Sequence, residues 1–178
     1  MKNAKTCLLL AGLMSAGGAS ADTTSQAFTV NASIIKGCVL GSGVTDVTTF
    51  GTLSFGQVSS LSSNISIVSS AGAGSVVIRC NPGQSVTLAL NVGNNVTGSI
   101  SAGRKLQNAT TLETLVYQLY KDSNYSTLWG DGSNGGTAQT VSSTGSTQEI
   151  KIYARLMSTS ILPTSGIYSD TVLLTVSY

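Results

Sequence analysis

The sequence predicts an all-β protein, most simply a β-sandwich. β-branched residues, Ser and Gly run through the whole chain, and short stretches of alternating apolar and polar residues are separated by turn-forming residues. Hardly any stretch has the three-to-four-residue spacing of an amphipathic helix. About eight short strands with no helix between them are typical of a sandwich.

The strand pattern recurs along residues 50–178. It is clearest at 85–92, where Val86, Leu88 and Leu90 share one face, while 115–120 is apolar at most positions and is expected in the centre of a sheet. Asn81-Pro82-Gly83 places Pro and Gly as a type II turn requires. The predicted strands are 50–56, 64–68, 75–80, 85–92, 115–120, 138–141, 149–156 and 170–178.

A further strand pattern precedes these strands, at residues 26–34. Apolar and polar residues alternate with period two, and Ile35 falls outside the alternation. Burial of each large side chain of the apolar face would contribute roughly 1.5–3 kcal/mol, so this strand is suited to a hydrophobic groove. The groove belongs either to the same domain or to a partner, and the pattern alone fits both. The apolar face consists of Phe28, Val30, Ala32 and Ile34.

The first 21 residues have the form of a secretory signal peptide. Lys2 and Lys5 supply a basic start, residues 7–16 are apolar, and Ala19-Ser20-Ala21 has the small-x-small form of a cleavage site. The apolar run is too short to span a bilayer. We therefore expect export, cleavage after about Ala21, and a mature chain with an N-terminal segment at 22–37 and one domain at 38–178.

Charge and cysteine content exclude several classes of partner. The chain has nine Lys and Arg against seven acidic residues, and the loss of Lys2 and Lys5 makes the mature chain neutral by formal count. Because there is no basic cluster, nucleic acid is not an expected partner. Cys38 and Cys80 are the cysteines of the mature chain, and an exported pair is expected to form a disulfide worth about 4 kcal/mol.

No catalytic, metal or cofactor site can be proposed from the sequence. The chain has no His, and its seven acidic residues are scattered, so neither a triad nor a metal site has the necessary groups. We therefore expect no enzyme activity, no cofactor and no small-molecule substrate. Asp122 and Asp131 suggest a calcium loop, but the bidentate Glu that would end such a loop is missing.

Two other features have an ordinary and a functional interpretation. Trp129-Gly130-Asp131-Gly132 would suit a sugar-binding platform, but a packed aromatic residue beside an Asp-Gly turn is the more common arrangement. Arg104, Lys105 and Arg155 are the noticeable basic positions, and we expect them to be solvated residues at strand edges.

Six motifs follow one another along the mature chain. They are Phe28-x-Val30-x-Ala32-x-Ile34 before Gly37-Cys38, Phe50-Gly51-Thr52-Leu53-Ser54-Phe55-Gly56, Tyr117-x-Leu119-Tyr120-x-Asp122, Trp129-Gly130-Asp131-Gly132, Tyr153-Ala154-Arg155-Leu156 and Gly166-x-Tyr168-x-Asp170-Thr171-Val172. Taken in order, these motifs resemble the spore coat protein U family, which includes the pilus subunits of archaic (Csu-type) chaperone–usher systems. The resemblance covers essentially the whole mature chain. One departure is Ala154, where many members have Gly.

The resemblance implies an incomplete immunoglobulin-like β-sandwich that is completed by donor-strand complementation. A periplasmic chaperone would first supply the missing strand, and after passage through an outer-membrane usher the N-terminal strand of the next subunit would replace it. Residues 22–37 are then the donor segment, with Phe28, Val30, Ala32 and Ile34 as its buried face. The acceptor edge and chaperone contact would be Val172, Leu174, Val176 and Tyr178.

By this resemblance the protein is a structural pilin that polymerises head to tail with copies of itself or related pilins, for surface attachment and biofilm formation. A second interpretation is a self-complete spore-coat or cell-surface protein whose N-terminal strand stays in its own domain. A third is a carbohydrate-binding adhesin. Adhesive tips are expected to carry an extra domain, and a single mature domain counts against the third interpretation.

Overall fold

The computed structural model describes residues 26–178 in two units that divide after Ile34. The expected signal peptide at 1–21 lies outside the described residues. Residues 26–34 form no strand by themselves, and the side chains of Phe28, Val30 and Ile34 are 87%, 80% and 87% exposed. Residues 26–34 therefore have the alternating sequence of a strand but pair with no strand of their own unit.

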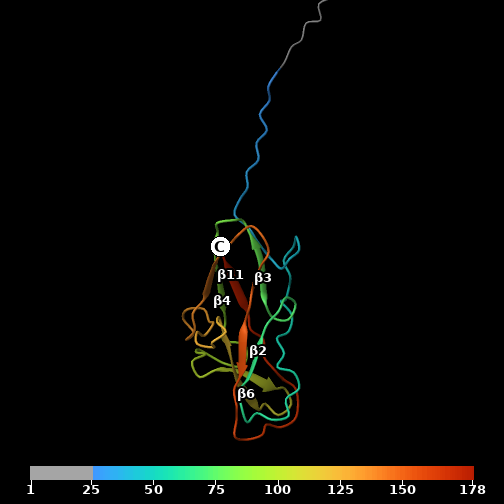
Figure 1. Cartoon of the computed structure of the whole chain (residues 1–178), viewed down its shortest axis with the longest axis vertical. Helices are drawn as coiled ribbons and strands as arrows, with labels where there is room; N and C mark the ends of the chain where they lie inside the picture. Colours follow the sequence, from blue (N-terminus) through green and yellow to red (C-terminus); the bar gives the residue numbers. More distant parts are fainter. Residues whose placement is uncertain (1–25) are drawn as a thin grey trace, which may run out of the picture. The chain divides into compact units, whose positions relative to one another are not determined.

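The second unit is all-β, which confirms the predicted fold class (Figure 1). Among residues 26–178 there is no helix that could cross a lipid bilayer. The strands are β1 (Cys38–Leu40), β2 (Ile65–Val68), β3 (Val76–Cys80), β4 (Ser85–Leu90), β5 (Arg104–Asn108), β6 (Thr114–Tyr120), β7 (Gln139–Ser142), β8 (Gln148–Ile150), β9 (Tyr153–Leu156), β10 (Tyr168–Ser169) and β11 (Leu174–Ser177).

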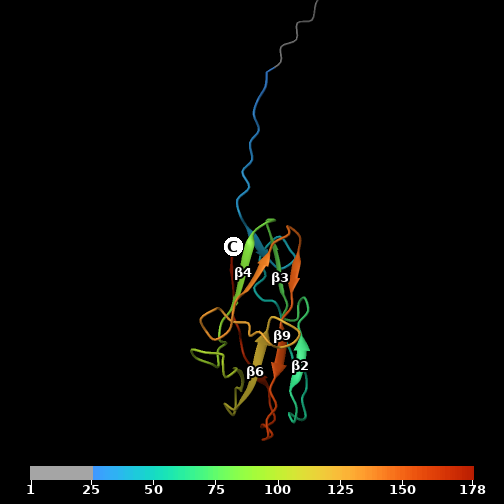
Figure 2. The same cartoon turned by 60° about the vertical axis from the view of Figure 1, so that its left-hand side comes forward.

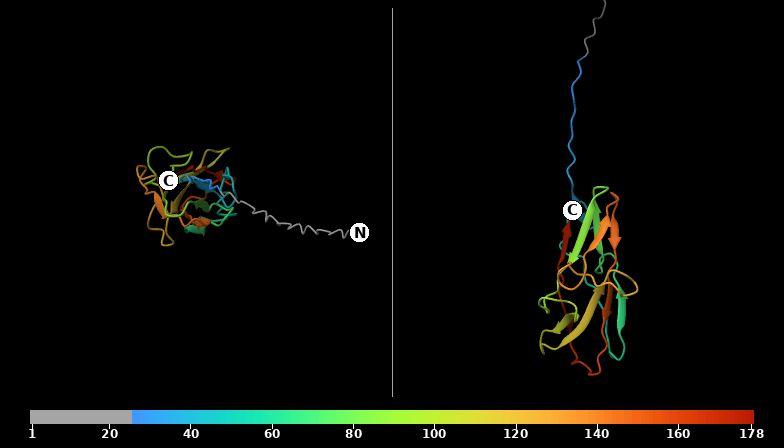
Figure 3. Two further views of the ribbon diagram at one scale, coloured as in Figure 1. Left: turned by 90° about the horizontal axis from the view of Figure 1, so that it is seen from above. Right: turned by 90° about the vertical axis from the view of Figure 1, so that its left-hand side faces the viewer.

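The strands form three sheets, and every pairing between named strands is antiparallel. One sheet has the order β10-β5-β6-β9-β2, so β6 is central, as its apolar sequence indicates. The other two have the orders β1-β3-β8 and β11-β4-β7. Figures 2 and 3 show the five-stranded sheet toward one end of this unit and the two smaller sheets toward the end that carries the C-terminus.

The core lies between these sheets and is built from the alternate residues of the central strands. Ile78, Val86 and Leu88 are fully buried, and so is Trp129. The indole Nε1 of Trp129 donates a hydrogen bond of 3.0 Å to the carbonyl of Leu88, which satisfies its polar atom inside the core. Trp129 is therefore a packed core residue and no sugar platform.

Three predicted strands differ in the structure. The predicted strand at 170–178 is a strand only over β11, because residues 170–173 belong to no strand. Residues 50–56 form no strand and make a single bridge between Gly51 and Ala73. The predicted strand at 149–156 is two strands, because β8 pairs with β3 in one sheet and β9 pairs with β2 and β6 in another. Where the chain passes from one sheet to the other, the Ile152 amide donates a hydrogen bond of 2.7 Å to the hydroxyl of Ser69. The buried amide at this position is therefore paired.

The expectation that Arg104 is a solvated edge residue is wrong. Its side chain is fully buried, and Nη2 donates hydrogen bonds of 2.8 Å to the carbonyls of Asn91 and Trp129. Desolvation lowers the pKa of the guanidinium, and the fields of Tyr117 and Asp170 oppose that shift. Arg104 thus joins three chain segments through their carbonyl groups.

Candidate functional site

The described domain contains an apolar groove of about 550 Å³. One wall is the chain at 170–174, which leads into β11, and the other is the irregular chain at 47–55. Side chains from several strands form the floor between the two walls. The apolar residues that line the groove are Leu40, Val47, Phe50, Leu53, Phe55, Val76, Leu90, Leu106, Tyr117, Leu119, Ile152, Val172, Leu173 and Leu174.

The C-terminal wall is a crossing between two sheets. β10 pairs with β5, whereas β11 pairs with β4, so the chain changes sheets at 170–173. Asn91 holds this crossing by two hydrogen bonds. Its side-chain oxygen accepts one of 2.8 Å from the Leu173 amide, and its backbone amide donates one of 3.0 Å to the Leu173 carbonyl. The wall is therefore fixed by specific polar contacts as well as by its ladder.

Asp170 is the main polar anchor of that wall. One carboxylate oxygen accepts hydrogen bonds from the backbone amides of Asn94 (2.8 Å) and Thr171 (2.9 Å). The other oxygen accepts a hydrogen bond of 2.6 Å from the hydroxyl of Tyr117. A Cβ on Gly93 would lie 2.2 Å from this carboxylate, and Gly93 has φ +88°, so the turn beside Asp170 requires glycine.

Tyr117 connects the two walls across the floor. Its ring makes an edge-to-face contact with Phe55 of the opposite wall, with ring centroids 6.5 Å apart and planes at 69°. Burial, followed by the hydrogen bond to Asp170, raises the pKa of Tyr117 far above its ordinary value, so the hydroxyl stays a donor at any physiological pH. Tyr117 thus contacts both walls of the groove.

The N-terminal wall has few backbone pairings of its own. The amide of Gly74 donates a hydrogen bond of 2.9 Å to the carbonyl of Phe50, and Gly51 forms an isolated β-bridge with Ala73. Phe50, Leu53 and Phe55 are partly buried side chains packed on the core. This wall therefore lies against the core without belonging to any of the three sheets.

The predicted acceptor residues lie along the last strand and the crossing that leads into it. Val172 and Leu174 line the groove, while Val176 is half-buried on the same alternate set and Tyr178 is 56% exposed. β11 pairs with β4 on one side and is the end member of its sheet. Within residues 26–178 its other edge has no ladder partner, so its outer amide and carbonyl groups are free for a further strand.

Cys38 and Cys80, the pair that the sequence indicated, are joined by a disulfide with an S–S distance of 2.04 Å. They face each other in the β1–β3 ladder, and the Asn81 amide donates 3.0 Å to the carbonyl of Gly37. The first residue of the first strand is therefore covalently tied to a strand of the core.

The remaining polar candidates form local turns. Desolvation raises the pKa of Asp122, but hydrogen bonds donated by Thr127 and Ser126 outweigh it and bring the pKa down to about 2. Asp131 accepts from the amides of Ser133 and Asn134 in the same manner. Among residues 26–178 no cluster of three His, Cys, Asp or Glu side chains has the geometry to hold a metal ion.

The floor and the N-terminal wall of the groove could not be assigned from the sequence. The stretch 50–56 alternates apolar and polar residues, and that signal does mark Leu53 and Phe55 as facing inward together. Leu106, Tyr117 and Ile152 come from three different strands or connections, and only the sheet topology brings them to one surface.

Fold and groove together define a class of protein: a β-sandwich with a free edge strand beside an apolar cleft. The model of the Spore Coat Protein U domain matches residues 24–175, and the chain belongs to that family, as the sequence motifs indicated. No curated protein matches the chain.

Among solved structures, the chain is similar to the crystal structure of the CsuC–CsuE chaperone–tip adhesion subunit pre-assembly complex from the archaic chaperone–usher Csu pili of Acinetobacter baumannii. The identity is 20% and the TM-score 0.46, over 64% of this chain and 34% of that one. The chain thus spans about a third of the length of that matched chain.

Proposed function

We propose that this protein is a structural subunit of an archaic chaperone–usher pilus and that it polymerises by donor-strand exchange. The single observation that carries the proposal is the apolar groove of about 550 Å³ beside β11. Its position gives an incoming strand both a row of free backbone groups and a set of apolar pockets, which are the two requirements of strand addition.

The N-terminal segment has the complementary properties. Phe28, Val30 and Ile34 are highly exposed, and the segment forms no strand within its own unit. Placing these side chains in a groove would contribute roughly 1.5–3 kcal/mol each, and the backbone would gain a ladder. Residues 22–37 are the donor segment in this proposal, and residues 38–178 form the acceptor domain.

A donor and an acceptor at different places on one chain form an open head-to-tail polymer, because the contact does not close on itself. Before assembly the same groove needs a temporary occupant, since a free edge beside apolar pockets is an aggregation hazard. A periplasmic chaperone fills that role in the proposal, and an outer-membrane usher exchanges it for the next subunit.

The proposed location is the cell surface, reached through the periplasm after removal of the signal peptide at about Ala21. The proposed role is mechanical and adhesive, in surface attachment and biofilm formation, and not catalytic. Family membership supports this proposal, because the match extends over both the donor segment and the acceptor domain.

A denaturing gel of material sheared from cells tests the proposal. Samples are loaded with and without boiling, and we expect a ladder of multimers that collapses to monomer only after boiling. A single monomer band in both lanes would support the self-complete coat protein, in which residues 26–34 occupy the groove of their own domain.

A further inference from the structure

Four large apolar side chains are exposed on the β5–β6 turn and on the loop between β9 and β10, a set that we call the end patch. Exposed apolar clusters on a soluble domain mark interaction sites more often than isolated exposed residues do. Figures 1 and 2 show the loop before β10 at the end of the domain opposite the C-terminus. The end patch consists of Leu112 (66% exposed), Ile161 (76%), Leu162 (72%) and Ile167 (86%).

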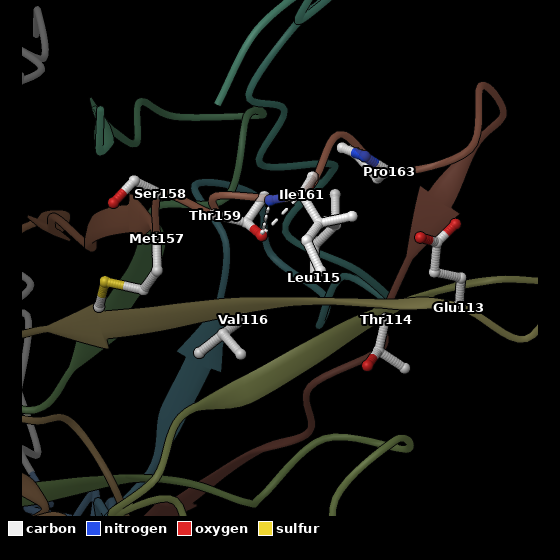
Figure 4. Close-up of a pocket in the computed structure, with 9 residues that line it drawn as sticks. All are labelled: Glu113, Thr114, Leu115, Val116, Met157, Ser158, Thr159, Ile161 and Pro163. Carbon is white, nitrogen blue, oxygen red and sulfur yellow. Dashed lines mark hydrogen bonds between the residues drawn. The ribbon is translucent and has the colours of Figure 1, made fainter. Parts of the chain in front are cut away.

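The end patch is held by a fixed scaffold. One oxygen of the Glu113 carboxylate accepts two hydrogen bonds of 2.8 Å, one from the Thr164 amide and one from the Tyr168 hydroxyl. These bonds brace the β5–β6 hairpin against the loop before β10. The nearby pocket is lined by Leu115, Ile161 and Pro163 beside Glu113 (Figure 4). The exposed side chains are therefore presented by ordered loops.

Leu112 also carries backbone strain. Its φ is +61°, a conformation that Gly or Asn adopts easily and that a leucine adopts at a cost. The chain thus places a large apolar side chain, at an exposed position, where the backbone favours a small residue. Residues in strained conformations concentrate at functional sites, because another selected property maintains them.

The chain itself indicates what covers the end patch, and this step rests on the proposed function. Every ladder between named strands is antiparallel, so we take a donor strand to run antiparallel to β11. β11 runs from the crossing at 170–173 toward the C-terminus. The donor must then run away from Tyr178, and its last residue, Ile34, must lie toward the end of the acceptor that carries the end patch.

The link from the donor strand to its own domain is short. The chain from Ile34 to Cys38 spans at most ~14 Å, even when fully extended. Cys38 is bonded to Cys80 and lies beside the turn between β3 and β4, at the end of the domain where the C-terminus also lies. That end of the donating copy must therefore come against the end-patch end of the accepting copy.

We infer that the end patch is a second contact surface between neighbouring copies of this chain, which packs on the residues that directly follow the partner's donor strand. Ile35 is the apolar residue of that link, it falls outside the donor alternation, and it is exposed. Donor-strand exchange thus fixes the connection between copies, and the end patch fixes the angle between them.

Hydroxyl-radical footprinting of the full-length mature protein tests this inference. Oxidation at Ile161, Leu162 and Ile167 is compared between unassembled subunits and sheared polymer, with Tyr125 as the internal reference. We expect the rates at the three residues to fall about fivefold or more in the polymer, as expected for side chains that enter an interface core, while the rate at Tyr125 stays unchanged.

Two substitutions of opposite charge supply a second test of the inference. Leu162→Asp should leave the boil-sensitive ladder intact and make the fibres visibly less straight in electron micrographs, whereas Val68→Asp on the β2 edge should not. Adding Ile35→Lys to Leu162→Asp should restore straight fibres.

The outcomes separate the two proposals. A ladder without protection of the end patch overturns the inference and leaves donor-strand exchange in place. If the end patch stays accessible in the polymer and Leu162→Asp lowers adhesion to polystyrene, the patch binds foreign surfaces and not a second copy. Absence of any ladder would overturn the proposed function, and the inference with it.

Discussion

The hydroxyl of Tyr117 donates a hydrogen bond of 2.6 Å to the carboxylate of Asp170, and this bond joins the floor of the apolar groove to its C-terminal wall. The same carboxylate accepts the Asn94 amide, so the bond also reaches the loop after β4. Because Tyr117 contacts Phe55 on the other side, the two walls share one central residue.

Tyr117→Phe keeps the ring and removes this hydrogen bond. A bond to a charged acceptor contributes about 1.5–3 kcal/mol, so we expect a loss of that order in the free energy of unfolding, measured by urea titration of the mature chain. Tyr125→Phe is the matched control, because Tyr125 is partly exposed and packs on Tyr120 and Tyr153 away from the groove. Equal losses in the two variants would show that the bond to Asp170 does not stabilise the groove.

The proposed donor segment offers an inner-face and an outer-face substitution. Val30→Asp would place an unpaired carboxylate in an apolar groove at a cost of several kcal/mol, and no multimer ladder should form. Thr29→Asp, on the opposite face of the same strand, should assemble as the unmodified chain does. If Thr29→Asp blocks assembly as fully as Val30→Asp, the proposed facing of the donor is wrong.

The disulfide closes a loop with a sequence separation of 42 residues. Cys80→Ser should lower the free energy of unfolding by about 4 kcal/mol on the chain-entropy model and sharply reduce the amount of subunit in the periplasm. Mass spectrometry of the native mature protein should find no free thiol, and two free thiols would contradict this prediction.

The C-terminal strand is the proposed contact of the chaperone. Val176→Asp should abolish co-purification with the chaperone, because it would place an unpaired carboxylate on the half-buried face of β11. The matched control is Ser177→Asp, on the exposed face of the same strand. Chaperone capture of the Val176→Asp protein at the level of the control would exclude β11 as the contact.

The brace at Glu113 predicts a pH effect. The hydrogen bond from Tyr168, followed by that from Thr164, lowers the pKa of Glu113 below its ordinary 4.5. A lowered pKa means that the brace stabilises the loop fully above pH 4.5 and is lost as the pH falls through the lowered value. The NMR shift of the Thr164 amide should therefore titrate with a midpoint below 4.5, and Glu113→Gln should remove the transition.

Much of the fold follows from period-two alternation. The face of Val86, Leu88 and Leu90 is buried in β4 as predicted, and β6 is central because it is apolar at most positions. The disulfide pairing could be expected from the export signal and the two remaining cysteines. These properties depend on residues close together in the sequence, or on composition.

The points at which the chain changes sheets could not be predicted. Residues 149–156 alternate without a break, yet the chain crosses between sheets at Ile152, where the Ser69 hydroxyl accepts its amide. β5 begins with Arg104, whose polar character suggested a solvated position, and burial became favourable because two carbonyls from distant segments meet there. The groove has the same origin, since its floor exists only once three sheets are assembled.

The disulfide at the first strand has a mechanical consequence for a fibre under tension. A pull transmitted through a donor strand would enter the donor's own domain at Cys38, at the start of the three-residue edge strand β1. Without a covalent tie, such a load would peel β1 from its neighbour one hydrogen bond at a time. Because Cys38 is bonded to Cys80 at the end of β3, the force bypasses that weak ladder and passes into a strand whose side chains are mostly buried. In the proposed polymer the breaking point would then move from the start of the domain to the groove, where a whole strand would have to be sheared out at once.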